Sequence, residues 1–229
     1  MRQSRRELAA GAAIILAAAL LALPAGGQQA GGKKVPANNS SVEKPAARDG
    51  GYAQRFASVC AACHGANGRT DTPGMPVLAG QPSFYAITQL FLFREGRRGN
   101  PAMSAIAKPM TDADLRGFSD FIGTLPPVPA PASAKPSDAT LMSRGAVLAK
   151  RHKCIFCHGA DLSGGQQVPR IGGQREDYLL MALQGFKTGT RSGYSQAMTE
   201  ALSQVPPEDL SALAYYVARF PGALAKSGE

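Results

Sequence analysis

Apolar side chains recur at helical spacing in three successive segments, and three similar segments return further along the chain. No run of strand-like alternation between apolar and polar residues competes with them. The pattern predicts an all-α chain made of two similar units. The expected helices cover roughly 51–62, 83–95 and a segment beginning after Thr111 in the first unit, and 139–154, 175–187 and a segment beginning at Pro206-Pro207 in the second.

The middle segment of each unit places apolar residues at helical spacing. The expected apolar face consists of Phe84, Ile87 and Phe91 in the first unit and of Tyr178, Met181 and Leu183 in the second. The third helix has a start signal, because Thr-Asp-Ala-Asp at 111–114 resembles a capping box. The loops are long and rich in glycine and proline, so each unit has little core of its own. Something other than side chains is therefore expected to fill it.

The two units are copies of each other. MPVLAGQPSFYAITQLFLFREGRR at 75–98 aligns with VPRIGGQREDYLLMALQGFKTGTR at 168–191 without a gap, and DADLRGFSDFIGTL at 112–125 matches PEDLSALAYYVARF at 207–220. Identical residues include Pro76 and Pro169, Gln81 and Gln174, Tyr85 and Tyr178, Leu90 and Leu183, Phe93 and Phe186, and Arg98 and Arg191. The sequence predicts two tandem domains that arose from one duplicated unit.

The N-terminus has the pattern of an export signal. A basic start leads into the apolar run LAAGAAIILAAALLAL at 8–23, which is short for a membrane span. An uncleaved anchor, with membrane association through the N-terminus, is the alternative. The expected organisation is a signal peptide at 1–25, a flexible tether at 26–47, a first domain at 48–125, a proline-rich linker at 126–137 and a second domain at 138–229.

The net charge of the chain restricts the possible binding partners only slightly. The formal net charge of +9 favours acidic partners, while only 18% of the residues are charged. The basic residues are scattered and no nucleic-acid-binding motif accompanies them, so we expect no nucleic-acid partner.

The candidate chemistry lies in a repeated Cys-x-x-Cys-His motif. The motifs use all four cysteines, Cys60, Cys63, Cys154 and Cys157, and two of the three histidines, His64 and His158. On a helical turn the three side chains share one face, so two thiols can bond to the vinyl groups of a haem while the imidazole reaches its iron. A zinc site built from the two cysteine pairs would leave both histidines unused. A thioredoxin-like cysteine pair needs a strand–turn–helix context, which the sequence does not show. A disulfide that closes so short a loop would restrict the unfolded chain very little. The motifs predict two covalently attached haem c groups.

The repeat also selects a sixth ligand for each iron. Of the seven methionines, only Met103 and Met198 coincide between the copies. Met75 faces Val168, Met110 faces Val205, Met181 faces Thr88 and Met142 faces Arg48, while Met1 belongs to the signal. We therefore expect His64 and Met103 on the first iron and His158 and Met198 on the second. Iron with both axial positions filled has no open position for a substrate, which favours one-electron transfer without catalysis.

With these residues in place, the chain resembles the cytochrome c4 family, dihaem members of the class I cytochromes c, over about residues 49–221. The most specific parts are the two CxxCH motifs, P-x-L/I-x-G-Q at 76–81 and 169–174, and methionine-containing loops before each last helix. The resemblance implies two mostly helical domains around one haem each, related by a pseudo-twofold axis. It also implies that the carbonyls of Pro76 and Pro169 accept a hydrogen bond from the ligand histidines, and that Tyr85 and Tyr178 line the haems.

The expected function is that of a periplasmic carrier that passes single electrons from respiratory-chain donors to a terminal oxidase or reductase. The alternative is the dihaem subunit of a dehydrogenase complex, such as a flavocytochrome. A dihaem peroxidase is disfavoured, because it needs a haem that can open. Lys150, Arg151 and Lys153 precede Cys154 and suggest docking onto an acidic patch of a redox partner, with a solvated helix end as the alternative, whereas His152 is expected at the surface.

Overall fold

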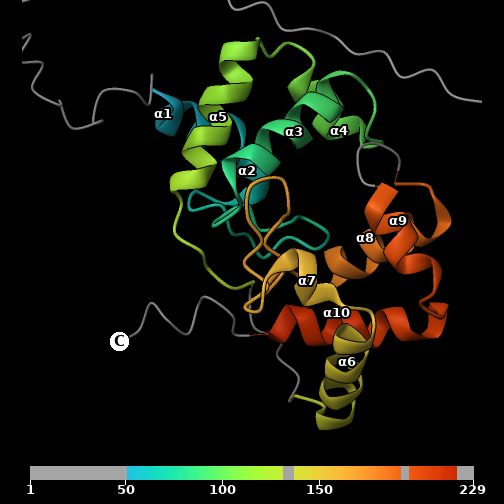
Figure 1. Cartoon of the computed structure of the whole chain (residues 1–229). Coiled ribbons are helices and arrows are strands. Elements are labelled where there is room, and N and C mark those ends of the chain that lie inside the picture. Colours follow the sequence, from blue (N-terminus) through green and yellow to red (C-terminus); the bar gives the residue numbers. More distant parts are fainter. Residues whose placement is uncertain (1–50, 131–136, 192–195, 221–229) are drawn as a thin grey trace, which may run out of the picture. The chain divides into compact units, whose positions relative to one another are not determined.

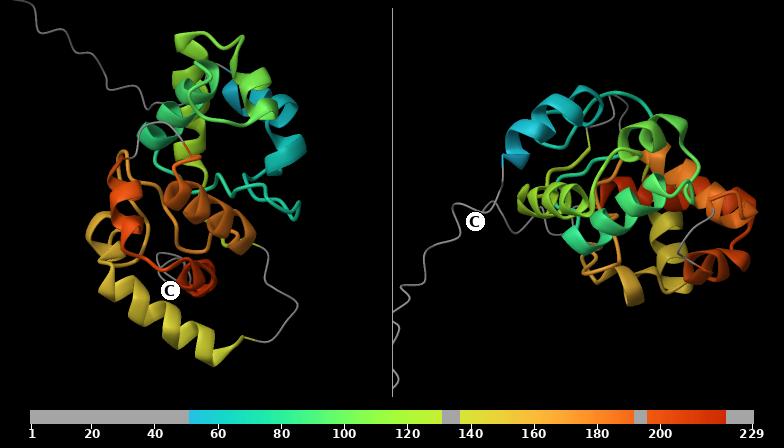
Figure 2. Two further views of the ribbon diagram at one scale, coloured as in Figure 1. Left: turned by 90° about the vertical axis from the view of Figure 1, so that its right-hand side faces the viewer. Right: turned by 90° about the horizontal axis from the view of Figure 1, so that it is seen from above.

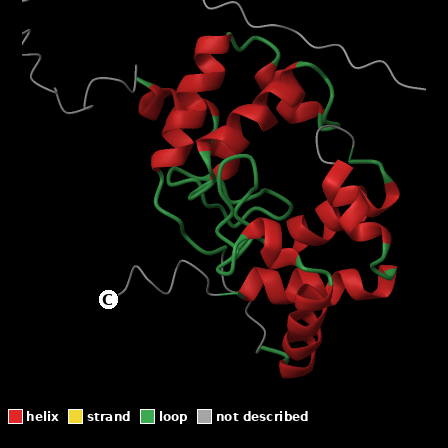
Figure 3. Ribbon diagram, viewed as in Figure 1, coloured by secondary structure: helices red, strands yellow, loops and turns green. Residues whose placement is uncertain are grey.

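The computed structural model describes residues 51–130, 137–191 and 196–220. Within these ranges the regular elements are helices, and the only strand-like feature is an isolated bridge between Gly165 and Val168 (Figure 3). This confirms the all-α fold class. No helix in these ranges is long and apolar enough to cross a membrane.

The first half packs its helices around the middle one. It contains α1 (Tyr52–Val59), α2 (Ala61–His64), α3 (Ser83–Arg94), α4 (Pro101–Ala107) and α5 (Asp112–Thr124) (Figure 1). Helix α3 contacts both α4 and α5, and α1 contacts α5. The second of the expected helices therefore forms the centre of this half.

The second half repeats this arrangement. It contains α6 (Ala139–Arg151), α7 (Cys154–His158), α8 (Glu176–Thr188), α9 (Gln196–Ser203), the 3-10 turn η1 (Pro207–Asp209) and α10 (Leu210–Arg219). Helix α8 contacts α9 and α10, and α6 crosses α10, as seen from two further directions in Figure 2. Each contact has its counterpart in the first half, as a duplicated unit requires.

The expected apolar face of the middle helices was only partly right: Ile87 and Leu183 pack against the cores, but other members are exposed. Phe84 is 55% exposed and Met181 is 52% exposed. The buried positions of α3 are instead Ala86, Leu90, Leu92 and Phe93, and α8 buries Leu179. Because α3 carries apolar residues almost all round, periodicity did not identify which face turns inward.

The methionine-containing segments are helices and not the expected loops. Asn100 begins α4, because its side chain accepts a hydrogen bond from the Met103 backbone N–H and Pro101 occupies the first turn. The corresponding segment of the second half is α9, which contains Met198. Each expected sixth ligand is thus fixed on a helix that packs against the middle helix of its half.

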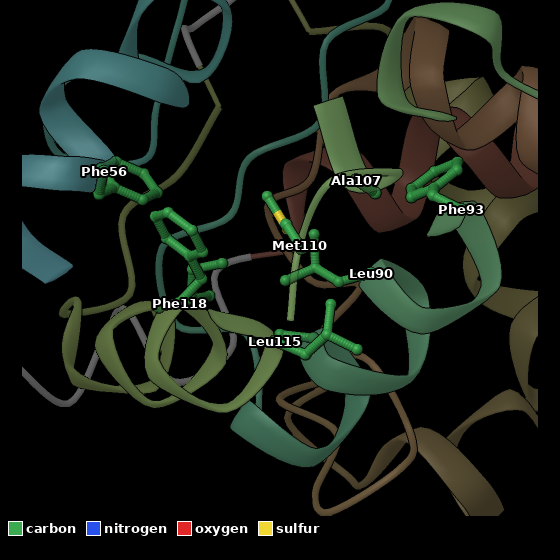
Figure 4. Close-up of a cluster of buried hydrophobic side chains, with 9 residues drawn as sticks. Phe56, Leu90, Phe93, Ala107, Met110, Leu115 and Phe118 are labelled. Carbon is green, nitrogen blue, oxygen red and sulfur yellow. The ribbon is translucent and has the colours of Figure 1, made fainter. Parts of the chain in front are cut away.

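The last helix of the first half begins as expected. Thr111 and Asp114 form a capping box, in which each side chain accepts a hydrogen bond from the other's backbone N–H. This helix buries Leu115 and Phe118 in the apolar cluster of Figure 4, which also contains Phe56 of α1. The same cluster reaches α3 and α4, so it binds the helices of the half into one core.

The two halves exchange a pair of buried amide contacts. The Gln81 side chain donates to the Arg170 carbonyl at 2.8 Å and accepts from the Arg170 backbone N–H at 3.1 Å. Gln174 makes the equivalent pair with Val77, donating to its carbonyl at 2.9 Å and accepting from its N–H at 2.7 Å. Since Val77 and Arg170 are aligned in the repeat, the contacts are reciprocal, as a pseudo-twofold axis demands.

The start of the proline-rich linker packs against both halves. Gly80, with φ of +71°, allows Pro127 to approach so closely that a Cβ at this position would lie 2.6 Å from the Pro127 Cβ. The Ala130 N–H donates to the Gly173 carbonyl, and the Arg170 guanidinium donates to the Val128 carbonyl. The described part of the linker is therefore structural. The expected signal peptide, the tether and linker residues 131–136 lie outside the described residues, and the domain boundaries stay predictions.

Candidate functional site

Each Cys-x-x-Cys-His motif forms a short helix at the end of the first helix of its half. Cys60 directly precedes α2, and Cys154 begins α7. The first cysteine of each motif is half-buried and the second is exposed, while His64 and His158 are buried. The four thiols form no disulfide. The motifs therefore have the common face that covalent haem attachment needs, and the second cysteine of each lies at the surface.

Both histidines are oriented in the same way. The Nδ1 atom of His64 lies 3.0 Å from the Pro76 carbonyl oxygen, and that of His158 lies 3.0 Å from the Pro169 carbonyl oxygen. A carbonyl can only accept, so Nδ1 carries the proton and donates it. The lone pair is then on Nε2, the atom that a ligand histidine uses when its other nitrogen is held in this way. These contacts match the ones that the resemblance implied.

Burial keeps these groups in their neutral forms. It lowers the pKa of His64 and of His158, and the proline carbonyls only partly oppose it. Burial also raises the pKa of the Cys60 thiol to about 11 and that of Cys154 in the same direction. The histidines are therefore in the form that can ligate iron.

A cavity of about 580 Å³ connects the two motifs. Its lining includes the cysteines and histidines of both motifs, together with Met103, Met198 and many aliphatic side chains of both halves. Among the described residues no aspartate or glutamate lines it, whereas Arg98, Arg170, Arg191 and Lys153 do. An apolar cavity with thiols, imidazoles and cations suits haem, which is flat and apolar and carries two carboxylates. These residues fit the group that the motifs predict.

The cavity also contains two further methionines. Met75 and Met110 line it beside Met103, while Met181 does not. The aligned residues Val168 and Val205 line it too. The second half thus puts a side chain that cannot ligate iron at both places, which is consistent with a packing role for Met75 and Met110.

Comparison with known proteins identifies the family. The family model for cytochrome c matches residues 51–126 and 142–220. Cytochrome c4 from Pseudomonas aeruginosa is 28% identical, across 75% of this chain and 89% of its own length. The chain belongs to the cytochrome c4 family.

Two other relatives agree with this assignment. A protein named thiosulfate dehydrogenase electron acceptor, from Thiomonas intermedia, is 33% identical across 68% of this chain and 79% of its own. The crystal structure of reduced cytochrome c4 from Pseudomonas stutzeri has a TM-score of 0.65 at 25% identity, covering 75% of this chain and 98% of that one. The protein is thus a dihaem electron-transfer cytochrome with two covalent haem c groups, and its relatives indicate an electron carrier.

Sequence reasoning missed or misjudged three polar features of this cytochrome. His152 is half-buried and lines the cavity, so its expected place at the surface was wrong. The sequence shows Gln81 and Gln174 as repeated residues, but nothing in it indicates that their side chains connect the two halves. Arg98 and Arg191 were likewise repeated, and only the fold shows that both reach the cavity.

Proposed function

We propose that this cytochrome is a periplasmic carrier that moves single electrons from respiratory-chain donors to a terminal oxidase or reductase. In this proposal Cys60 and Cys63 hold the first haem and Cys154 and Cys157 the second. The observation that carries the proposal is the orientation of the two buried histidines by proline carbonyls. In both halves this contact occupies Nδ1 and leaves Nε2 available as an iron ligand. The N-terminal segment would direct export.

The proposed iron ligands are His64 with Met103, and His158 with Met198. Support comes from the equivalent positions of α4 and α9, which pack against the middle helices and line the cavity. Met103 is further fixed by the cap at Asn100. Thioether sulfur at the sixth position favours the reduced state relative to a second imidazole.

Bound haem c supplies the one-electron couple, and the protein residues keep that couple in place. The Pro76 and Pro169 carbonyls fix the histidine rings and raise their basicity as ligands. Leu90, Phe93 and Phe118 belong to the apolar core of the first half and also line the cavity, so they exclude water from that part of it. Because α3, α4 and α5 pack as one unit, this framework has little to rearrange when the charge on the iron changes.

The ligand assignment is tested by substitution and the far-red charge-transfer band of methionine-ligated ferric haem. Met103→Ala and Met198→Ala are each expected to remove about half of the band, and the double variant all of it. The controls are Met75→Val and Met110→Val, which introduce the residue of the other half and should leave the band intact. A full band in Met103→Ala, or its loss in Met110→Val, would reject the assignment.

The proposed exit for electrons is the attached haem edge of the second half. Ile155 and Phe156 stand between its two cysteines, and Phe156 is 86% exposed. Lys150, Arg151 and Lys153 are exposed beside them. The first half has small Ala61 and Ala62 between its cysteines and no cation in the preceding residues 56–59. An apolar centre with a basic rim on one half only supports docking of an acidic partner there.

Charge reversal tests this docking surface. Lys150→Glu together with Lys153→Glu should slow electron delivery to the partner oxidase at low salt and flatten its dependence on ionic strength. Lys108→Glu is the matched control, because Lys108 is an exposed cation of the first half. Unchanged salt dependence in the double variant, or an equal change in the control, would contradict docking at the second half.

A second candidate follows from the relative named thiosulfate dehydrogenase electron acceptor. In this case the donor is a dehydrogenase and catalysis occurs on another chain. Mixing the oxidised protein with such a dehydrogenase and thiosulfate would reduce both haems if this donor is right. Reduction by respiratory membranes but not by the dehydrogenase would favour the first candidate.

A further inference from the structure

His152 is the third histidine of the chain and the one that neither Cys-x-x-Cys-His motif uses. Its side chain lines the cavity, where its Nε2 atom is buried and has no hydrogen-bond partner. Among the described residues, the only other buried side-chain nitrogen or oxygen in this condition is Nε of Arg170. A polar atom that is neither solvated nor paired costs free energy, so the inward position of this imidazole calls for a function.

The backbone before the motif differs between the two halves. Helix α6 ends at Arg151, and Lys153 has a φ of +55°, in the left-handed region that residues with a side chain rarely adopt. In the first half, α1 continues through Ser58 and Val59, which stand at the same distances from the first cysteine, and Ser58 is exposed. Backbone strain of this kind clusters at functional positions. The kink therefore separates His152 from its counterpart Ser58, which does not line the cavity.

His152 also lies at the C-terminal end of α6. Its backbone N–H donates to the Leu148 carbonyl at 2.9 Å. The last carbonyls of a helix carry partial negative charge, which stabilises a cation placed beside them. The side chain is half-buried, so the ring reaches from the surface into the cavity and can exchange protons with water. This position suits an imidazole that is protonated in one state of the protein and neutral in another.

The charged groups around α6 offer His152 no carboxylate partner among the described residues. The elements packed against α6 are α7 and α10, the latter preceded by η1. Asp209 of η1 is paired with Arg144, and Arg219 of α10 with Glu176. The other titratable or charged groups of these elements and of the end of α6 are Cys154, Cys157, His158, Tyr215, Tyr216, Lys150, Arg151 and Lys153. Burial, and then Cys154, raises the pKa of Tyr216, so this phenol stays neutral.

One other group of the cavity could bind or release a proton near neutral pH. The Tyr178 hydroxyl accepts hydrogen bonds from Arg98 of the first half at 3.0 Å and from Arg191 at 3.1 Å. Burial would raise the pKa of this phenol, but the two guanidiniums outweigh burial and lower it to about 8. Tyr178 is therefore the group that an experiment must distinguish from His152.

We propose that His152 is a proton-binding site coupled to electron transfer at the second haem. His152 binds one proton from water as the second iron gains one electron from the donor, and it releases that proton when the electron leaves. One electron and one proton move together, and no bond between heavy atoms forms or breaks. The cause is charge compensation, because reduction removes one positive charge from an apolar cavity in which Coulombic interactions are strong. The proposal rests on the proposed function, in which Cys154 and Cys157 hold that haem.

Coupling of this kind makes one reduction potential depend on pH. A proton that binds more tightly to the reduced protein stabilises the reduced state more at low pH, so the potential falls as the pH rises. The steepest possible dependence is tenfold in the redox equilibrium constant per pH unit, which is about 59 mV for a one-electron couple. The first half has Ser58 in the equivalent position, so the potential of its haem should lack this dependence.

Spectroelectrochemical titration of the holoprotein between about pH 5 and about pH 8 tests the site. In wild type we expect the redox equilibrium of one haem to change by roughly three- to tenfold per pH unit. His152→Gln, which keeps a polar side chain that cannot be protonated, should abolish this dependence. Ser58→Gln is the matched control at the equivalent position of the first half, and it should leave both pH profiles as in wild type.

The same titration identifies the haem and the proton-binding group. Met198→Ala removes the proposed ligand of the second iron, so the potential that it lowers should be the pH-dependent one. A pH dependence that belongs to the first haem would overturn the proposal. So would a dependence that survives His152→Gln, and its loss in Tyr178→Phe would then assign the proton to the phenol.

A second measurement needs no variant. The chain has three histidines, and His64 and His158 are expected on the irons, so His152 is the one whose ring should titrate. Nuclear magnetic resonance of wild-type holoprotein labelled with ¹⁵N in histidine should show one such ring, with its midpoint at higher pH in the reduced than in the oxidised protein. Equal midpoints, or no titrating ring, would overturn the proposal even if His152→Gln failed to mature. Fewer than two haems per chain would instead refute the proposed function, so the two failures are distinguishable.

Discussion

The reciprocal glutamine contacts lead to a sharp prediction about local opening. Gln174 is 3% exposed, and its amide both donates to and accepts from the backbone of Val77. In Gln174→Ala the Val77 N–H and carbonyl would stay in the interface without these partners. We expect the Val77 amide to lose its protection against hydrogen exchange, and the Arg170 amide to do so in Gln81→Ala.

The magnitude follows from the two hydrogen bonds lost at Val77. Leaving one buried backbone group unpaired costs about 1–3 kcal/mol, and relaxation of the neighbouring chain recovers part of the second loss. Counting one full loss, the exchange rate at Val77 should rise roughly 5- to 150-fold. The effect should be local, since the helical cores of the halves do not depend on these amides.

The assay is amide exchange followed by nuclear magnetic resonance on the reduced holoprotein. Gln204→Ala is the control, because Gln204 is exposed and its side chain hydrogen-bonds to the neighbouring Ser203. The double variant Gln81→Ala/Gln174→Ala should lose protection at both amides. If Val77 and Arg170 exchanged as slowly in the double variant as in wild type, the glutamines would not be what closes the interface.

Three further predictions concern stability. Asp114 caps α5, and its pKa is held well below the ordinary 3.8 by the Thr111 backbone N–H and then by Arg55, so Asp114→Asn should cost about 1 kcal/mol at pH 7. As pH falls below about 4, the unfolded chain takes up a proton at this carboxyl while native Asp114 stays ionised, so the deficit should shrink, and equal thermal-unfolding deficits at pH 7 and pH 3 would contradict this. Gly145 lies where α6 crosses α10, and Gly145→Val should lower the free energy of unfolding by about 1–3 kcal/mol through overpacking. The control Ser143→Val changes an exposed residue of the same helix and should not have this effect. Equal melting temperatures for the two variants would refute the close crossing. Gly80 has a positive φ and is in close contact with the linker, so Gly80→Ala should lower the melting temperature by several degrees. An unchanged melting temperature would show that the linker moves away to make room for the added methyl group.

The sequence predicted the helices and the haem motifs well, because both depend on local patterns. Alignment of the halves also placed both proposed methionine ligands on equivalent elements before any geometry was known. Helix α4 was not predicted although Asn100-Pro101 is a helix start signal, because Pro101–Ala107 is too short to show helical periodicity.

Burial and pairing across the chain were beyond sequence patterns. Helix α3 has apolar residues on nearly every side, so its inward face at Leu90 was set by what packs against it. The partners of Gln81 and Arg98 lie in the other half, and no local rule connects residues that far apart. Their repetition in the alignment was the one available signal, and it indicated that the positions matter without indicating what they contact.

The exchanged glutamines have an evolutionary implication. A contact in which each copy offers the same residue to the same backbone position of the other is the form of an isologous dimer interface. Joined by a linker, such a pair stays associated at any dilution, because the partner is always present. A symmetric dimer must present two identical faces to its partners, and a fused one is free of that requirement. The small CAAC of one half and the exposed, basic-rimmed CIFC of the other are what that freedom allows: two surfaces that differ in size and charge on one molecule.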